Sequence, residues 1–498
     1  MISTRRIAII GSGFSGLCLA IQLKKSGIDS FTIFEQAQHL GGTWRDNHYP
    51  GAACDVPSFA YSFSFEAETA WTHKWAPHDE ILRYMERCAE KYDLYPHIRF
   101  SSPVASACFD ETTGQWLLRT TRGEESIADI LVSGCGQLNR PVIPDIAGLE
   151  RFQGKQFHSA RWDHSYDLSG KTVGVVGTAA SAIQFVPEVA KQVDKLHVFQ
   201  RSPNWMFPRF DRAYSEAEKR RFQHHPWLAR LYRWGLWGRL DLGWPVFRGN
   251  RLLGQRLEKL AEKHMRSTIE DPVLADKLVP DYPIGGKRLL ISDGYYATLN
   301  RDNVALDTNG IQRVTEAGVV TGDGREIALD ALIFATGFAT TDFLVPLEIE
   351  GREHHRLHED WKDGAEAYLG LTVSGYPNFF MLYGPNTNLG HNSIIFMIEC
   401  QALYILGCIR RLCDRNLRYL DVRPEAQAKF NHRLQKKLRR TVWAVPNRSW
   451  YKQADGRITN NWSGPTIRYW WQTRKPDFSA YVEVTRPNRN TTDGFEPP

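Results

Sequence analysis

A glycine-rich turn near the start of the chain separates a short apolar run from a longer one. Gly11, Gly13 and Gly16 have the spacing G-x-G-x-x-G, and residues 7–10 before them are typical of a buried strand. The run that follows, to Leu23, fits a helix. The first glycine makes the tight turn, the second lets backbone N–H groups approach a pyrophosphate, and the third lets the helix pack on the strand. The turn therefore predicts a dinucleotide-binding α/β unit.

The residues around this turn extend the predicted site. Phe14 and Ser15 lie inside the turn, and Glu35 follows the next predicted strand, residues 31–34. A carboxylate at the end of that strand can bind ribose hydroxyls. The alternative interpretation is a purely structural glycine turn with a surface glutamate.

A second, altered copy of the turn follows the predicted strand at residues 172–176. It reads Gly177-Thr178-Ala179-Ala180-Ser181-Ala182, with alanine in place of the second and third glycines. Arg201 follows the next predicted strand, where a cation suits a 2′-phosphate and so favours NADPH over NADH. The alternative is a helix-packing turn with a solvated arginine. Two such turns predict two doubly wound, Rossmann-like α/β domains.

Composition limits the classes of protein that remain. The chain has 498 residues, of which 42% are hydrophobic and 24% charged, as in an ordinary globular protein. Its net charge of +6 is too weak to suggest a nucleic-acid partner. No apolar stretch is long enough to predict a transmembrane helix. Eight scattered cysteines without C-x-x-C spacing fit a reducing, cytoplasmic location.

The pattern along the chain predicts two discontinuous domains. Residues 1–147 and 385–498 form the first, and residues 148–208 and 285–384 form the second. Residues 209–284 are predicted to be a helical insertion in the second domain, and a long helix is expected near 394–412. The insertion holds four of the 16 tryptophans, beside several arginines. We interpret this cluster as a buried core in preference to a peripheral membrane contact; the four are Trp227, Trp234, Trp237 and Trp244.

Two longer motifs are more specific than either turn. The first is Gly41-Gly42-Thr43-Trp44-x4-Tyr49-Pro50-Gly51-x3-Asp55, and the second is Phe152-x-Gly154-x3-His158-x3-Trp162-Asp163. Both resemble the fingerprints of Baeyer–Villiger monooxygenases, which are class B flavoprotein monooxygenases. The A-T-G step at 335–337 and the segment Gly384-Pro385-Asn386 also resemble that family. The resemblance runs from about residue 7 to residue 471.

The resemblance implies FAD at the first turn and NADPH at the second. In that family NADPH reduces the flavin, O2 forms a C4a-peroxyflavin, and a small-molecule ketone becomes an ester or lactone. The active site is then expected in the cleft between the two domains. The natural ketone and the oligomeric state stay open at this point.

Lys287 and Arg288 resemble the catalytic Lys-Arg step of the family. The resemblance implies that Arg288 is the catalytic cation, that Asp55 fixes its position, and that Lys287 helps to bind the 2′-phosphate. An arginine suits this role because it stays charged and offers several donors in one plane. The alternative is a pair of solvated charges at a strand end.

Further cofactor contacts are predicted at positions along both motifs and turns. These are Gly42, Thr43, Trp44, Tyr49, Asp55, Val56, Tyr61, Val104, Gly177, Thr178, Ala179, Ala180, Ser181, Gln184, Asn386 and Trp450. His158 is interpreted as a hinge or packing residue. Two positions depart from the family pattern: His48 stands where an arginine is common, and Ala179 where a glycine is usual.

Three other functions compete with this interpretation. A flavin monooxygenase that oxygenates nitrogen or sulfur would share both nucleotide sites, but Trp162-Asp163 favours the ketone-oxidising group. A flavin disulfide reductase needs a cysteine pair at the flavin, and Cys408 and Cys413 lie far from either turn in sequence. A non-catalytic nucleotide-binding protein would not need Arg288.

Overall fold

Two parallel five-stranded sheets organise the part of the chain that the computed structural model describes, residues 5–445, 451–453 and 455–486. The first has the order β19-β7-β1-β2-β3, and all of its pairs are parallel. Its strands are β1 (Ile7–Ile10), β2 (Phe31–Phe34), β3 (Ile98–Arg99), β7 (Ile130–Ser133) and β19 (Phe379–Met381). β1 and β7 are apolar almost throughout and buried at every position, as central strands of a parallel sheet must be.

The second sheet repeats this arrangement with the order β13-β10-β9-β17-β8, again entirely parallel. Its strands are β8 (Lys155–His158), β9 (Thr172–Val176), β10 (Lys195–Phe199), β13 (Val304–Asp307) and β17 (Ala331–Phe334). Each glycine turn joins a central strand to a helix: β1 to α1 (Phe14–Lys25) and β9 to α4 (Ala182–Val189). The predicted α/β class with two doubly wound units is confirmed.

Two strands return to the first unit earlier than the predicted boundaries allow. β19 pairs with β7, and β18 (Glu348–Glu350) pairs with β4 (Val104–Asp110). Both lie within 285–384, which the sequence pattern places in the second domain. The boundary at 384 is therefore too late for these strands, because pairing and not sequence position decides which sheet a strand joins. The other boundaries stay predictions.

Smaller sheets flank the two main ones. β4, β5 (Gln115–Thr120) and β6 (Glu125–Ala128) form antiparallel pairs, as do β14 (Ile311–Val314), β15 (Gly318–Thr321) and β16 (Glu326–Ala328). β11 (Met206–Phe207) pairs in parallel with β12 (Leu290–Ile291), and β20 (Leu417–Val422) is antiparallel to β21 (Tyr481–Thr485).

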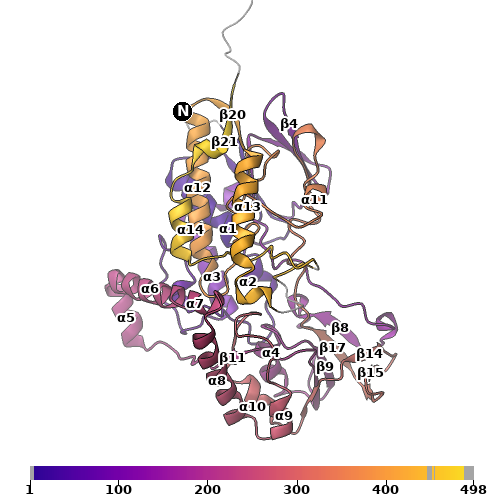
Figure 1. The fold of residues 1–498 in the computed structure, drawn as a ribbon. Helices are drawn as coiled ribbons and strands as arrows, with labels where there is room; N and C mark the ends of the chain where they lie inside the picture. The colour runs from indigo at the N-terminus through magenta and orange to yellow at the C-terminus, as the bar shows by residue number, and fades with distance from the viewer. Residues whose placement is uncertain (1–4, 446–450, 454, 487–498) are drawn as a thin grey trace, which may run out of the picture.

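Helices from both ends of the chain cover the first sheet. α12 (Ile394–Asp414) packs against α1, which confirms the long helix expected near 394–412. Figure 1 shows it in the upper part of the molecule beside α13 (Pro424–Leu438) and α14 (Thr466–Thr473). The remaining α-helices outside the insertion are α2 (Thr43–Asp46), α3 (His78–Lys91), α10 (Tyr295–Leu299) and α11 (Leu357–Asp360). No helix in the described ranges is long and apolar enough to span a bilayer.

The predicted insertion is helical. It contains α5 (Glu216–His224), α6 (Pro226–Asp241), α7 (Trp244–Phe247), α8 (Arg251–Thr268) and α9 (Pro272–Asp276). Figure 1 shows α5 and α6 reaching away from the body of the molecule.

The expectation that the insertion tryptophans form a buried core is wrong for two of them. Trp227 and Trp234 are more than half exposed, while Trp237 and Trp244 are partly buried. The reason is the side that α6 packs: buried Arg233 donates hydrogen bonds to the carbonyl of Phe59 and the hydroxyl of Ser62. Trp227 and Trp234, on another side of α6, are left facing solvent.

Candidate active site

One cavity of about 1280 Å³ reaches both glycine turns. Parallel sheets of this kind bind ligands beyond the carboxyl ends of their strands, and both turns lie there. Most predicted site residues line it: Gly11, Gly13, Phe14, Ser15, Glu35, Gly42, Thr43, Trp44, Tyr49, Asp55, Val56, Tyr61, Val104, Gly177, Thr178, Ala179, Ala180, Ser181, Gln184, Arg201, Lys287 and Arg288. Gly16 and Asn386 do not, and Trp450 lies outside the described residues.

Each of the three glycines of the first turn is needed for a different structural reason. Gly11 has a φ of +98°, which favours glycine, and its N–H donates to the carbonyl of Phe34 at 2.8 Å. A Cβ at Gly16 would lie 1.9 Å from the carbonyl oxygen of Gly11, so this glycine lets α1 pack on the turn. A Cβ at Gly13 would meet no atom closer than the Cα of Gly42, at 3.8 Å. Gly13 therefore leaves room on the cavity side.

The N-terminus of α1 has no side-chain cap. Its first backbone N–H groups have no intrahelical acceptor, and they carry the positive end of the helix dipole. Ser15 lies in this first turn and lines the cavity. The arrangement fits a pyrophosphate at Gly11–Gly16.

Glu35 is buried, and neighbouring groups hold its carboxylate in place. The N–H and hydroxyl of Ser12 donate to one oxygen at 2.9 and 2.7 Å, and the N–H of Ala37 donates to the other at 2.9 Å. Arg45 adds an ion pair at 3.0 Å. Sequence reasoning found Glu35 but missed Arg45, which follows Trp44 in the first long motif. Glu35 thus ties the turn to β2 and also lines the cavity.

Aromatic rings form one wall of the first site. The indole N–H of Trp44 donates to the hydroxyl of Tyr61 at 3.3 Å, and Phe14 meets the Tyr61 ring edge-on with centroids 5.4 Å apart. Burial raises the pKa of Tyr61 well above its ordinary value, so its hydroxyl stays neutral. This wall is flat, apolar and uncharged, as an aromatic ligand requires.

The second turn begins with a glycine in the same backbone conformation as Gly11. Gly177 has a φ of +106°, and its N–H donates to the carbonyl of Phe199 at 3.0 Å. A Cβ there would lie 2.6 Å from the carbonyl oxygen of Ala335, so the one glycine retained is the one that packing requires. Ala179 is exposed at the cavity. α4 follows the turn without a side-chain cap.

Two cations lie near the end of β10. The ammonium of Lys287 donates to the hydroxyl of Ser202 at 2.9 Å and lies 4.4 Å from the ring centre of Tyr282. Burial, and then the nearby charge of Arg201, lower the pKa of Lys287. Within the described ranges neither cation forms an ion pair. Two uncompensated positive charges beside a dinucleotide turn fit a 2′-phosphate.

Arg288 and Asp55 both line the cavity and contact each other, as expected. The Nε of Arg288 donates to Oδ2 of Asp55 at 2.8 Å, and a second guanidinium nitrogen donates to the same oxygen. The carboxylate raises the pKa of Arg288 further above its ordinary value. The arginine side chain remains 37% exposed. Asp55 therefore orients a cation whose remaining N–H groups are available to a ligand.

Three predicted positions have contacts that differ from cofactor binding. Asn386 is buried, and its amide donates to the carbonyls of Ile458 and Asn461 at 2.8 and 3.2 Å, so it secures a loop. Gln184 accepts from the Tyr49 hydroxyl at 2.9 Å and donates to the Ala53 carbonyl at 2.9 Å. Gln184 and Tyr49 thus join the first long motif to α4.

Sequence reasoning also missed a tyrosine in the cavity wall. Tyr383 lines the cavity with a φ of +58°, and its hydroxyl donates to Asn388 at 2.7 Å. Its position directly before the motif Gly384-Pro385-Asn386 was the available signal.

His48, which departs from the family pattern, contacts His164. Its Nδ1 lies 2.8 Å from Nε2 of His164, and the two rings stack with centroids 4.9 Å apart. Burial, followed by the charge of His164, lowers the pKa of His48. Two histidines at this distance share one proton between their nitrogens. The departure therefore places a histidine–histidine contact between the two units where an arginine is common in the family.

Comparison with known proteins agrees with this arrangement. The profile of the flavin-binding monooxygenase-like family matches residues 4–219. A Baeyer–Villiger monooxygenase of Pseudomonas aeruginosa is 45% identical, covering 97% of this chain and 92% of its own length. One from Streptomyces coelicolor is 44% identical, covering 97% and 93%. The solved structure of OTEMO in complex with FAD and NADP has a TM-score of 0.87 at 28% identity, covering 97% of this chain and 100% of its own.

Fold, cavity and profile match together define a flavin-binding monooxygenase. The identity to curated relatives over nearly the whole length shows more: the chain belongs to the Baeyer–Villiger monooxygenase family. The predicted enzyme class, an NADPH-dependent flavoprotein monooxygenase, is confirmed. A reaction of this class uses O2 and a small-molecule substrate.

Proposed function

We propose that this chain binds FAD at residues 11–16 and NADPH at residues 177–182, and inserts one oxygen beside a ketone carbonyl to give an ester or lactone. The observation that carries the proposal is the Arg288–Asp55 pair, which lines the same cavity as both turns. The eight free cysteines support the cytoplasmic location that belongs to this proposal.

The residues of the first site fit FAD. The open side of Gly13 and the uncapped start of α1 would accommodate a pyrophosphate. Glu35 lines the cavity at the end of the next strand, where its carboxylate would bind ribose hydroxyls. The wall formed by Phe14, Trp44 and Tyr61 supports an aromatic ring system. When bound, FAD supplies the redox chemistry: it accepts a hydride from NADPH and passes the electrons to O2.

The residues of the second site fit NADPH. Gly177 and the start of α4 would receive its pyrophosphate, and Arg201 with Lys287 would receive its 2′-phosphate. The selectivity for NADPH over NADH follows from these two cations, since NADH carries a hydroxyl at that position.

Arg288 provides the fixed positive charge of the reaction. It holds that charge beside the substrate as negative charge develops on the carbonyl oxygen, and it needs no reorganisation because Asp55 has already oriented it. Tyr49 and Gln184 join the two units next to this pair and position the cavity walls. Trp44 and Tyr61 add apolar surface to the cavity lining.

A product assay tests the proposal. Purified protein is incubated with NADPH, 18O2 and a panel of ketones and sulfides, and products are analysed by mass spectrometry. We expect esters or lactones that contain one labelled oxygen, with a reaction lacking NADPH as the control. Sulfoxides without any ester would overturn the proposal in favour of sulfur oxygenation. Absence of NADPH oxidation would indicate a nucleotide-binding protein without catalysis.

A further inference from the structure

Two helices that take no part in the cavity expose large apolar side chains. We call this surface the tryptophan face and define it as Trp227, Leu231 and Trp234 on α6 with Ile467, Trp470 and Trp471 on α14. Each is between 39% and 60% exposed. Single exposed apolar residues are ordinary, but six of them on two helices are a feature that needs a function.

The spacing on each helix gathers these side chains into a stripe. On α6 they recur at i, i+4 and i+7, and on α14 at i, i+3 and i+4, so each set lies on one side of its helix. The other sides are already packed. Arg233 of α6 bonds to Phe59 and Ser62, and buried Tyr469 of α14 accepts from Gln401 at 3.0 Å. Both helices therefore direct their unpartnered side outward.

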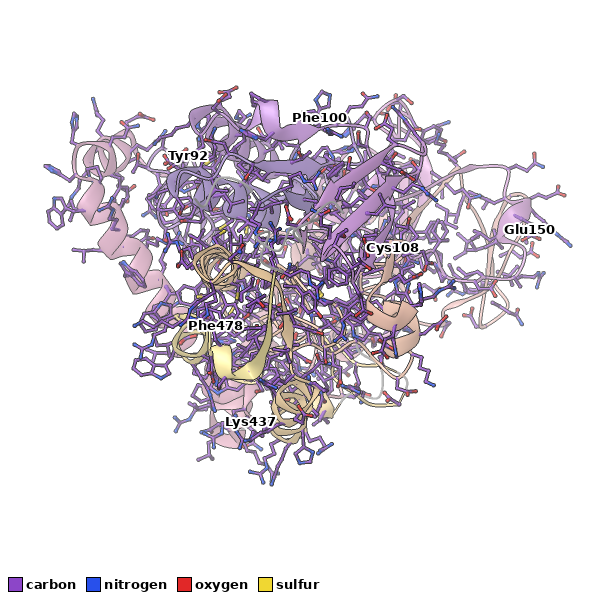
Figure 2. All side chains as sticks on the ribbon, turned by 90° about the horizontal axis from the view of Figure 1, so that it is seen from above. Tyr92, Phe100, Cys108, Glu150, Lys437 and Phe478 are labelled. Atoms are coloured by element: carbon purple, nitrogen blue, oxygen red, sulfur yellow. The ribbon has the colours of Figure 1, made fainter. Side chains whose placement is uncertain are left out.

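Hydrogen bonds join the end of α6 to the start of α14. The carboxylate of Asp241, at the end of α6, accepts from both the N–H and the hydroxyl of Thr466, at the start of α14, each at 2.8 Å. Trp237 of α6 packs on Phe396 of α12 with ring centroids 5.3 Å apart. In Figures 1 and 2, α6 and the yellow α14 lie on the same side of the molecule. The two stripes therefore lie on the same side of the molecule.

The exposed charged residues of α6 and α14 are all arginines, and Asp477 beyond α14 is the nearest exposed carboxylate in sequence. Five exposed cations flank it: Arg230, Arg239, Arg468, Arg474 and Lys475. None of the five forms an ion pair within the described part of the chain. The guanidinium of Arg474 lies 3.5 Å from the ring centre of Trp471. Asp241 is the one acidic residue in the two helices, and its carboxylate is engaged by Thr466.

We infer that the tryptophan face binds the surface of an anionic lipid bilayer. Tryptophan is the side chain that settles at the boundary between headgroups and acyl chains, and unpaired arginines attract anionic headgroups. A second copy of this chain fits less well, because a two-fold contact would place the arginines of one copy against those of the other. Charge complementarity thus selects the lipid surface.

Vesicle binding tests this inference on the full-length, FAD-loaded protein. The protein is sedimented with vesicles of phosphatidylcholine alone or mixed with phosphatidylglycerol. We expect binding to the mixed vesicles, at least about tenfold weaker binding to the neutral ones, and a loss of binding at high salt. The double variant Trp227→Ser/Trp234→Ser should bind the mixed vesicles about tenfold less than the parent protein.

Matched control variants distinguish binding by the tryptophan face from a general effect of exposed apolar side chains on vesicle binding. Ile127→Ser and Val273→Ser each remove an exposed apolar side chain outside the face, and should leave vesicle binding unchanged. NADPH oxidation should be the same in every variant, because none of these residues lines the cavity. If the tryptophan variant loses FAD, Arg230→Gln/Arg239→Gln replaces it and should also weaken binding to the mixed vesicles.

Three results would overturn the inference. One is no binding of the parent protein to the mixed vesicles, and another is equal, salt-independent binding to both vesicle types. The third is a dimer in light scattering that disappears in the tryptophan variant while vesicle binding persists, which would assign the face to self-association.

Discussion

Among single residues, Arg288 allows the oxygen-insertion step to be tested separately from cofactor binding. Arg288→Ala should keep FAD bound and still oxidise NADPH, because neither turn contains this residue. Ester formation should fall by at least about 100-fold, the usual cost of losing a charged transition-state donor. The ratio of ester formed to NADPH consumed measures this, with Arg288→Lys as a partial rescue. An unchanged ratio in Arg288→Ala would remove Arg288 from its proposed role.

Arg201 provides a test of nucleotide selectivity. Arg201→Ala should raise KM for NADPH by roughly tenfold or more, because it removes a charge-assisted contact to the 2′-phosphate. KM for NADH should not change. Lys195→Ala, at the other end of the same strand, is the control and should behave like the parent protein. A parallel rise in both KM values would mean that Arg201 acts on the fold and not on the phosphate.

His158 makes a prediction about pH. It is buried, its Nδ1 accepts the N–H of Ala160 at 3.1 Å, and burial lowers its pKa to about 4 from an ordinary 6.5. Between these values the unfolded chain takes up a proton that the folded chain excludes, so stability falls as pH falls. The loss from this group is about 2 kcal/mol between pH 7 and pH 5.

Thermal unfolding at the two pH values checks the His158 prediction. The Tm of the parent protein should fall more between pH 7 and pH 5 than the Tm of His158→Gln. The glutamine side chain accepts the same hydrogen bond but does not titrate. Equal losses in the two proteins would contradict it.

At the scale of elements, two glycines of the first strand-turn-helix unit have different roles. We expect Gly16 to be needed for folding and Gly13 for FAD binding. Gly16→Ala should unfold or strongly destabilise the apoprotein, because its methyl group would overlap the Gly11 carbonyl. Gly13→Ala should fold normally but bind FAD about tenfold or more weakly, since without the cofactor the methyl group makes only an ordinary van der Waals contact with Gly42. Circular dichroism of the apoprotein and FAD titration distinguish the two. Loss of fold in Gly13→Ala would show that this glycine is structural as well.

The helices and strands also show which structural features the local sequence pattern can predict. β1 with α1 and β9 with α4 were predicted because apolar runs and small residues at a turn are local properties. The side on which α6 packs was not predictable from Trp227 and Trp234, because tryptophan suits a buried core and a wet interface equally well. Only the Arg233 contacts decide between the two.

At the scale of the whole molecule, Gln184 couples the two units. Its amide bonds to Tyr49 and Ala53, and burial raises the pKa of Tyr49 to about 12, so the hydroxyl remains a donor. Gln184→Ala leaves these partners unsatisfied and should loosen the cavity between the units. We expect the hydrogen peroxide released per NADPH to at least double, with FAD content unchanged. Gln192→Ala, an exposed position, is the control, and equal peroxide yields in both variants would contradict the coupling role.

The sequence alone determined the two nucleotide-binding units, because the glycines, strand ends and first helical turns that bind phosphates are close neighbours along the chain. The family resemblance then placed Arg288 and Asp55 together. They are 233 residues apart, and no local rule predicts that contact. Tertiary structure decided the Arg45–Glu35 pair, the bridging role of Gln184, the sheet that β19 joins, and the exposure of the tryptophan face. Each of these depends on which surfaces pack against each other, and packing is a property of the folded chain as a whole.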